Sequence, residues 1–140
     1  MEKNYLDEVC RENQDVNPLF AFLDARMEIP ARGEARFTLP VSRGLIQGGG
    51  VVAGGILATM ADEAMAHAVM SLLDKGQSTV TVEMNIRYMR SAGPERRGTL
   101  SSVARVIRSG ATLCVAEADV LNEENRLLAR AGATFYIIDG

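Results

Sequence analysis

The chain has 140 residues, enough for one domain with a substantial core, and 47% of them are hydrophobic. Its net charge of −3 argues against general nucleic-acid binding, which requires a basic surface. A single histidine excludes a histidine-rich metal site, and a count of only two cysteines fits a reducing compartment. We therefore expect a cytoplasmic protein with one domain over residues 1–140 that needs no metal or redox cofactor.

The first half of the sequence predicts short elements and then a loop. The first fifteen residues are charged throughout, which is unlike a signal peptide. Asn17 followed by Pro18 is typical of a helix start, and the glycines at 48–50 indicate a loop over 42–50. The expected elements are an exposed helix over 2–12 within an N-terminal extension of residues 1–16, a short helix over 19–23, and strands over 26–29 and 34–41.

The second half predicts one long helix followed by strands. The stretch 51–73 is apolar enough to suggest a membrane helix, but Asp62, Glu63 and His67 near its middle argue against that. Its alanine, methionine and leucine content favours a buried helix over 54–73. The period-two alternation that follows predicts four antiparallel strands, over 79–90, 98–108, 112–121 and 127–138. The pattern predicts an α+β fold in which an antiparallel sheet wraps around one long central helix.

Asp62 is the residue that packing explains least well. A carboxylate inside the longest apolar stretch is costly to bury unless it is paired or neutralised. It shares a helical stripe with Gly55, Thr59 and Ala66, and this stripe should face a core or an interface. The adjacent Gly54 and Gly55 can open the helix, whose free N–H groups would polarise a carbonyl. A carboxylate together with such an oxyanion site suits acyl-transfer hydrolysis.

The spacing of these residues resembles that of a known enzyme family. The bacterial hotdog acyl-CoA thioesterases, of the phenylacetate-pathway type within the 4-hydroxybenzoyl-CoA thioesterase superfamily, have an Asn or Gln followed by Gly, by His-Gly-Gly and by an acidic residue. Here Gln47, Gly50, Ala53-Gly54-Gly55 and Asp62 fall on that spacing. The stretches 81–90 and 126–136 are also similar to family strands, and the resemblance covers about residues 17–138. It implies the hotdog fold.

The resemblance also implies a mechanism. The Gly55 N–H would bind the thioester carbonyl oxygen, and Asp62 would act as a general base on water or as a nucleophile. Gln47 and Thr81 would orient water and substrate, and the products would be a free acid and coenzyme A. Gly55 and Asp62 are seven residues apart, which is roughly 10 Å along a helix. A site that uses both therefore needs antiparallel helices from two subunits, and the family forms such dimers.

A group of arginines suggests how coenzyme A is held. Arg87, Arg90, Arg96 and Arg97 gather near one strand end, and arginine recognises phosphate well. We expect Arg87, Arg90 and Arg97 to contact the substrate, together with Gly54 and Ala53 beside the thioester. The expected partners are a small acyl-CoA molecule and further copies of this chain, as a homodimer or homotetramer. We expect neither nucleic acid nor a membrane as a partner.

One departure from the family pattern leaves other functions open. Ala53 stands where the family has a histidine that is implicated in positioning the substrate. The first alternative is therefore a non-catalytic protein that binds acyl-CoA or an aromatic ligand on the same fold. The second is an interaction protein whose helix stripe serves only oligomerisation. His67 follows Glu63 by four residues, an ion-pair spacing, and we expect it to be structural because it matches no catalytic position of the family.

Overall fold

The computed structural model describes residues 3–93 and 98–140. Every element that the sequence predicts is present, with its ends shifted by a few residues; the central helix, for example, ends at Met70 rather than at Leu73. In chain order the elements are α1 (Lys3–Val9), α2 (Pro18–Leu23), β1 (Arg26–Glu28), β2 (Glu34–Pro40), a 3-10 turn (Arg43–Leu45), α3 (Gly54–Met70), β3 (Ser78–Tyr88), β4 (Thr99–Ser109), β5 (Leu113–Leu121) and β6 (Leu127–Ile138).

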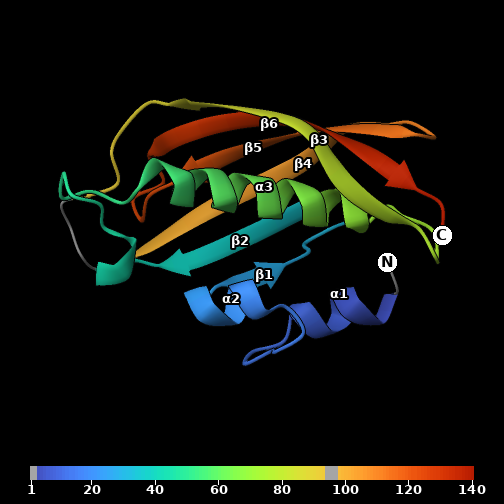
Figure 1. Ribbon diagram of the computed structural model, residues 1–140, viewed down its shortest axis with the longest axis horizontal. Helices are drawn as coiled ribbons and strands as arrows, with labels where there is room; N and C mark the ends of the chain where they lie inside the picture. Colours follow the sequence, from blue (N-terminus) through green and yellow to red (C-terminus); the bar gives the residue numbers. More distant parts are fainter. Residues whose placement is uncertain (1–2, 94–97) are drawn as a thin grey trace.

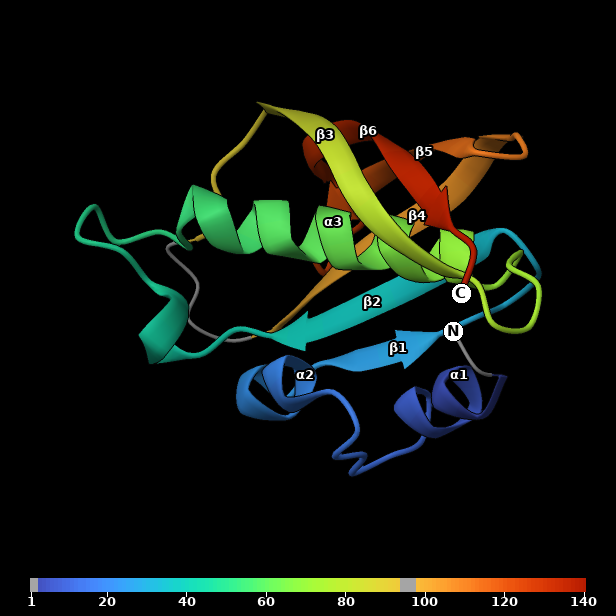
Figure 2. The ribbon, with the colours of Figure 1, turned by 45° about the vertical axis from the view of Figure 1, so that its right-hand side comes forward.

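The strands form one antiparallel sheet that curls around α3. Their order is β1-β2-β4-β5-β6-β3, so that β3 is an edge strand although it follows the helix directly in sequence. Figures 1 and 2 show α3 lying along the concave side of this sheet, with β3 crossing over it. The predicted α+β architecture and the hotdog arrangement are therefore confirmed. None of the helices in the described part of the chain has the length and hydropathy needed to cross a membrane.

Small side chains on α3 allow the sheet to approach closely. Ala61, Ala64 and Ala68 are fully buried on the side of the helix that faces the strands. Larger residues such as Phe37 and Phe135 fill the space around them from β2 and β6. The interior is thus packed on the sheet side of α3, which leaves the opposite side of the helix for other contacts.

The N-terminal segment covers part of that opposite side. Figures 1 and 2 place α1 and α2 along β1, away from β3 and β6. The Phe20 ring packs edge-on against Phe37, with ring centroids 4.9 Å apart, and Val9 is only 1% exposed. The prediction of a mostly exposed helix at the N-terminus was therefore wrong for the inner side of α1, because this side closes the core.

A chain of hydrogen bonds fixes this segment to the middle of α3. Asn17 Nδ2 donates to the Tyr5 hydroxyl at 2.9 Å, so the hydroxyl proton is free to reach His67 Nε2 at 3.0 Å. His67 Nδ1 donates in turn to the backbone oxygen of Glu63 at 2.8 Å. His67 is thus neutral and satisfied on both nitrogens, and burial lowers its pKa to about 4. The spacing of Glu63 and His67, which suggested an ion pair, therefore corresponds to a hydrogen bond from the imidazole to the Glu63 backbone and not to a salt bridge.

A bulge in β3 changes which side chains face α3. Thr81 pairs with the buried Phe135, whereas Glu83 pairs with the neighbouring Thr134, so Val82 is an extra residue. Thr81 therefore lies on the inner face of the sheet, and Glu83 lies on the outer face. The uninterrupted alternation that we predicted over 79–90 was wrong at this point, since the bulge shifts its phase by one residue.

Candidate active site

The site begins where α3 starts. Ala53 is the N-cap in an extended conformation, and its side chain caps nothing. The first N–H groups of the helix therefore have no side-chain partner from the cap, in contrast to α2, where Asn17 accepts a bond from the Phe20 N–H. Gly54 and Gly55 are exposed, and a Cβ added to Gly55 would meet nothing within 4 Å. Packing within one chain thus does not require a glycine at position 55.

Asp62 lies two turns further along α3 and is joined to β3. Its Oδ1 accepts a hydrogen bond of 2.9 Å from the Thr81 hydroxyl, while its side chain stays partly open to solvent. The Thr81 side chain is itself exposed. The pair therefore places an oriented carboxylate on a surface that solvent or a ligand can reach. Of the four catalytic candidates, these are the two that the fold brings into contact through side chains.

The other two candidates lie at the beginning of the helix. Asp62 is seven positions after Gly55, so the Gly55 N–H and the Asp62 carboxylate are roughly 10 Å apart along the helix axis. Gln47 lies in the loop before α3, where its side-chain oxygen accepts from the Gly49 N–H. Its backbone N–H and oxygen close the same loop through Val51 and Gly50, each at 2.9 Å. Gln47 is exposed beside the helix start.

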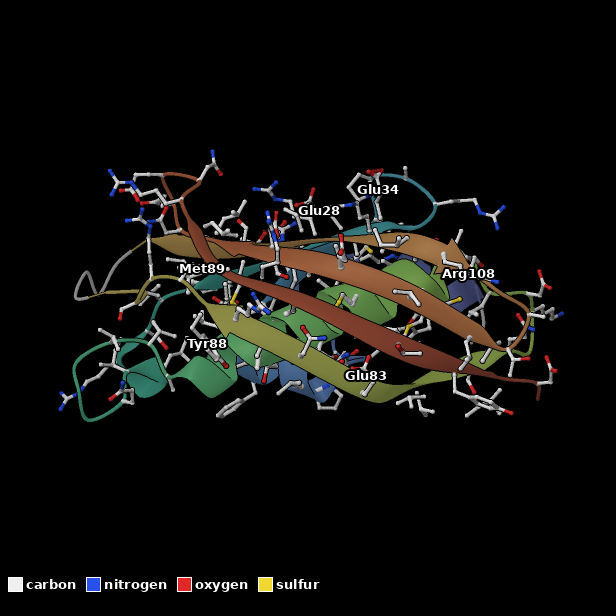
Figure 3. The ribbon with its side chains drawn as sticks, turned by 90° about the horizontal axis from the view of Figure 1, so that it is seen from above. Glu28, Glu34, Glu83, Tyr88, Met89 and Arg108 are labelled. Carbon is white, nitrogen blue, oxygen red and sulfur yellow. The ribbon has the colours of Figure 1, made fainter. Side chains whose placement is uncertain are left out.

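The strand end holds the first peptide of the helix. The Tyr88 hydroxyl donates a bond of 2.8 Å to the backbone oxygen of Gly54. Figure 3 shows Tyr88 at the level of the first turns of α3, while Glu83 lies further along β3. The period-two pattern placed Tyr88 only in a strand, so this contact was missed. The signal available in the sequence was a tyrosine at the end of a strand that begins close to the end of the helix, since an antiparallel return brings it to the helix start.

Glu63 was also overlooked as a titrating group. It lies next to Asp62 on α3, toward the N-terminal segment and Tyr5. Burial, and secondly the negative charge of Asp62, raise the pKa of Glu63 to about 7. The site thus has two adjacent carboxyl groups in different surroundings, one bonded to a hydroxyl and one mostly desolvated. Tyr5 of α1 lies near Glu63, so part of these surroundings comes from a distant segment of the chain.

The arginine candidates separate in the structure. Arg87 pairs with Arg130 across β3 and β6 and lies on the outer face, away from Asp62. Arg90 lines a pocket of about 530 Å³ where β3 ends and β4 begins, together with Thr99, Asn122 and Arg126. Two carboxylates, Glu123 and Glu124, line the same pocket. Arg96 and Arg97 lie outside the described residues. Within those residues, no cluster of three or more His, Cys, Asp or Glu side chains is arranged to hold a metal ion.

Comparison with known proteins identifies the family of this arrangement. Residues 49–129 match the model of the thioesterase superfamily, which covers the end of the loop, helix α3 and strands β3 to β5. A Halobacterium salinarum protein named as a candidate esterase is 38% identical over 112 residues, covering 76% of this chain and 72% of that protein.

Solved structures agree with the sequence match. A Ralstonia eutropha protein, described as a candidate thioesterase related to phenylacetic acid degradation, is 25% identical with a TM-score of 0.82, covering 95% of this chain and 99% of that one. A hypothetical thioesterase from Streptococcus pneumoniae, crystallised with coenzyme A, is 25% identical with a TM-score of 0.74, covering 82% and 86%. The resemblance seen in the sequence is confirmed.

Proposed function

Because the chain belongs to the thioesterase superfamily, we propose that it is a hydrolase that converts an acyl-CoA thioester into a free acid and coenzyme A. The single observation that carries this proposal is the bond between the Thr81 hydroxyl and Asp62, which orients a carboxylate on the accessible side of α3. The Streptococcus pneumoniae relative that was crystallised with coenzyme A supports this choice of thiol.

In the proposed reaction, Asp62 takes a proton from a water molecule as the water oxygen adds to the thioester carbonyl carbon. The carbonyl oxygen becomes negative and accepts a hydrogen bond from the Gly55 N–H at the positive end of α3. The carbonyl then re-forms as the carbon–sulfur bond breaks, and the leaving coenzyme A thiolate takes up the proton that Asp62 had accepted, which regenerates the Asp62 carboxylate. Thr81 orients Asp62 and the water, and Gln47 orients the substrate. Direct attack by the Asp62 carboxylate on the carbonyl carbon is the alternative route.

The distance between Gly55 and Asp62 requires a second chain, because roughly 10 Å is more than one carbonyl group spans. β3 supplies the surface for such a homodimer. It is an edge strand of eleven residues with exposed Val80 and Val82, at 50% and 58% exposure. Pairing two copies of β3 about a twofold axis would set the α3 helices antiparallel and bring the Gly55 of one chain toward the Asp62 of the other.

The nucleotide end of coenzyme A would bind outside this reaction centre. Arg90 and Arg126 face the pocket beside the end of β3, and guanidinium groups bind phosphate in a bidentate manner. Arg87 lies on the outer face, so it would contact coenzyme A only if the nucleotide extends over the sheet edge. Replacing Arg90 with Ala should raise KM for acyl-CoA while kcat changes little.

The test is an assay of thiol release from short-chain, medium-chain and aromatic acyl-CoA esters. The wild type should release coenzyme A, and Asp62→Asn should not, although it should keep the wild-type unfolding midpoint. Asp74→Asn is the matched control, because Asp74 is an exposed carboxylate just beyond α3. Equal turnover by the wild type and Asp62→Asn would refute the assigned role of Asp62.

Ala53 favours a second candidate, a non-catalytic acyl-CoA binder. The cap position carries a methyl group, so it offers no side-chain donor beside the Gly55 N–H. Calorimetric titration with coenzyme A and its esters separates the two candidates. Tight binding of an ester that no assay shows being hydrolysed would establish the binder and reject the enzyme.

A further inference from the structure

We propose that Tyr88 is a positioning residue that orients and strengthens the carbonyl-binding N–H at the start of α3. The inference rests on the proposed function, since it concerns the same N–H group of Gly55. It adds a residue from the end of β3 to a site otherwise formed by α3, the preceding loop and Thr81. The structural basis is the 2.8 Å bond from the Tyr88 hydroxyl to the backbone oxygen of Gly54.

The oxygen of Gly54 and the N–H of Gly55 belong to one peptide group. The six atoms of this group are planar, so a bond that fixes the direction of the carbonyl also fixes the direction of the N–H. A donor at the oxygen polarises the peptide, and this makes the N–H a stronger donor by roughly 10–30%. Tyr88 thus acts on the Gly55 N–H through the oxygen of the same peptide group, without touching the substrate.

The Tyr88 ring lies close to the backbone of Gly54. A Cβ added to Gly54 would lie 3.3 Å from two ring carbons of Tyr88, so the ring rests directly on the backbone of the first helical residue. A side chain at position 54 would therefore push the ring away by a few tenths of an ångström, so glycine suits this contact. This accounts for the first glycine of the pair through contacts within one chain, whereas a Cβ at Gly55 would meet nothing.

The hydroxyl is not needed to satisfy a buried group. Tyr88 is 52% exposed, and water could hydrogen-bond both its hydroxyl and the exposed Gly54 carbonyl. Losing the bond should therefore cost the fold little. Its consequence should appear in the transition state, where the negative oxygen depends most on a correctly aimed N–H.

The experiment compares Tyr88→Phe with Tyr136→Phe. Both variants keep the ring and remove one hydroxyl, and Tyr136 is a tyrosine of similar exposure on the outer face of β6. With an ester that the wild type hydrolyses, kcat of Tyr88→Phe should fall roughly fivefold while KM and the unfolding midpoint stay near the wild-type values. Tyr136→Phe should match the wild type in all three quantities.

Nuclear magnetic resonance of the free protein gives a readout that does not depend on turnover. In Tyr88→Phe the Gly54 carbonyl carbon and the Gly55 amide proton should both shift upfield, because the ring remains and only the hydrogen bond is lost. Unchanged signals for this peptide would overturn the inference. So would an unchanged kcat for Tyr88→Phe in an active enzyme. A wild type that hydrolyses no ester would instead defeat the proposed function, and the peptide signals would still decide whether Tyr88 holds this group.

Discussion

The Thr81 hydroxyl reaches Oδ1 of Asp62 at 2.9 Å because β3 has an extra residue immediately after Thr81. Met84 and Ile86 face the core from the same strand. In a regular strand, residue 81 would then point to the outer face, away from α3. The bulge at Val82 reverses this phase and turns Thr81 inward. The contact between the two candidate catalytic side chains therefore depends on a single irregularity of the sheet.

Thr81→Val should test this contact with almost no change in shape. Valine keeps the β-branched form but cannot donate a hydrogen bond to Asp62, so we expect kcat to fall roughly tenfold through the loss of one bond to a charged group. Thr81→Ser should retain most of the activity. Steady-state kinetics with the preferred ester measure both variants, and a valine variant as active as the wild type would remove Thr81 from the mechanism.

Gly55→Ala should separate stability from activity. The added methyl meets no atom within 4 Å in its own chain, and alanine favours a helix by up to about 1 kcal/mol over glycine. The unfolding midpoint should therefore stay constant or rise. Turnover should fall roughly tenfold or more, because the methyl group obstructs approach to the N–H. Gly44→Ala, at a glycine with equally open surroundings, is the control and should leave turnover unchanged.

Val82→Lys should dissociate the proposed dimer. A lysine on an edge strand opposes edge-to-edge pairing, and Val82 is exposed on β3. We expect light scattering to show monomers and the thiol assay to show lost turnover in the same preparation. Phe22→Lys, which replaces an apolar residue 85% exposed on α2, should change neither quantity. A monomeric Val82→Lys protein with full activity would contradict a site shared between chains.

Glu63→Gln should change the pH dependence of stability. The folded-state pKa of Glu63 is raised from 4.5 to about 7, so the unfolded chain releases this proton first. Ionisation of Glu63 therefore leaves the free energy of unfolding unchanged below pH 4.5 and lowers it progressively as the pH rises to 7. Above pH 7 the free energy of unfolding is lower by up to about 3 kcal/mol. Denaturant unfolding should show Glu63→Gln to be more stable than the wild type at pH 8 and similar to it at pH 4.5.

A matched control for this prediction is Glu34→Gln, at an exposed carboxylate on β2 that Figure 3 labels. It should not gain stability over the wild type between pH 4.5 and pH 8 in the way expected of Glu63→Gln, because it leaves Glu63 in place. If Glu63→Gln had the same free energy of unfolding as the wild type at both pH 4.5 and pH 8, burial would not control the titration of Glu63.

The sequence predicted the secondary-structure elements better than the contacts between their side chains. Period and composition located α3 and all six strands, and the position of Asp62 within the apolar stretch singled it out as a candidate functional residue. The bulge at Val82 has no glycine or proline to signal it, because it arises from the pairing of β3 with β6. Likewise, part of the surroundings of Glu63 comes from α1, which lies more than fifty residues away in the chain. The outward direction of Arg87 follows from the predicted alternation, and its pairing with Arg130 agrees with it.

The separation of Gly55 and Asp62 along one helix has a consequence for mixed assemblies. In the proposed dimer, each site takes its N–H from one chain and its carboxylate from the other. A heterodimer of one Gly55→Ala chain and one Asp62→Asn chain would therefore concentrate both defects in one site and leave the second site intact. Mixing the impaired Gly55→Ala protein with the inactive Asp62→Asn protein should therefore raise turnover above that of either preparation once their subunits exchange, because each heterodimer contains one intact site.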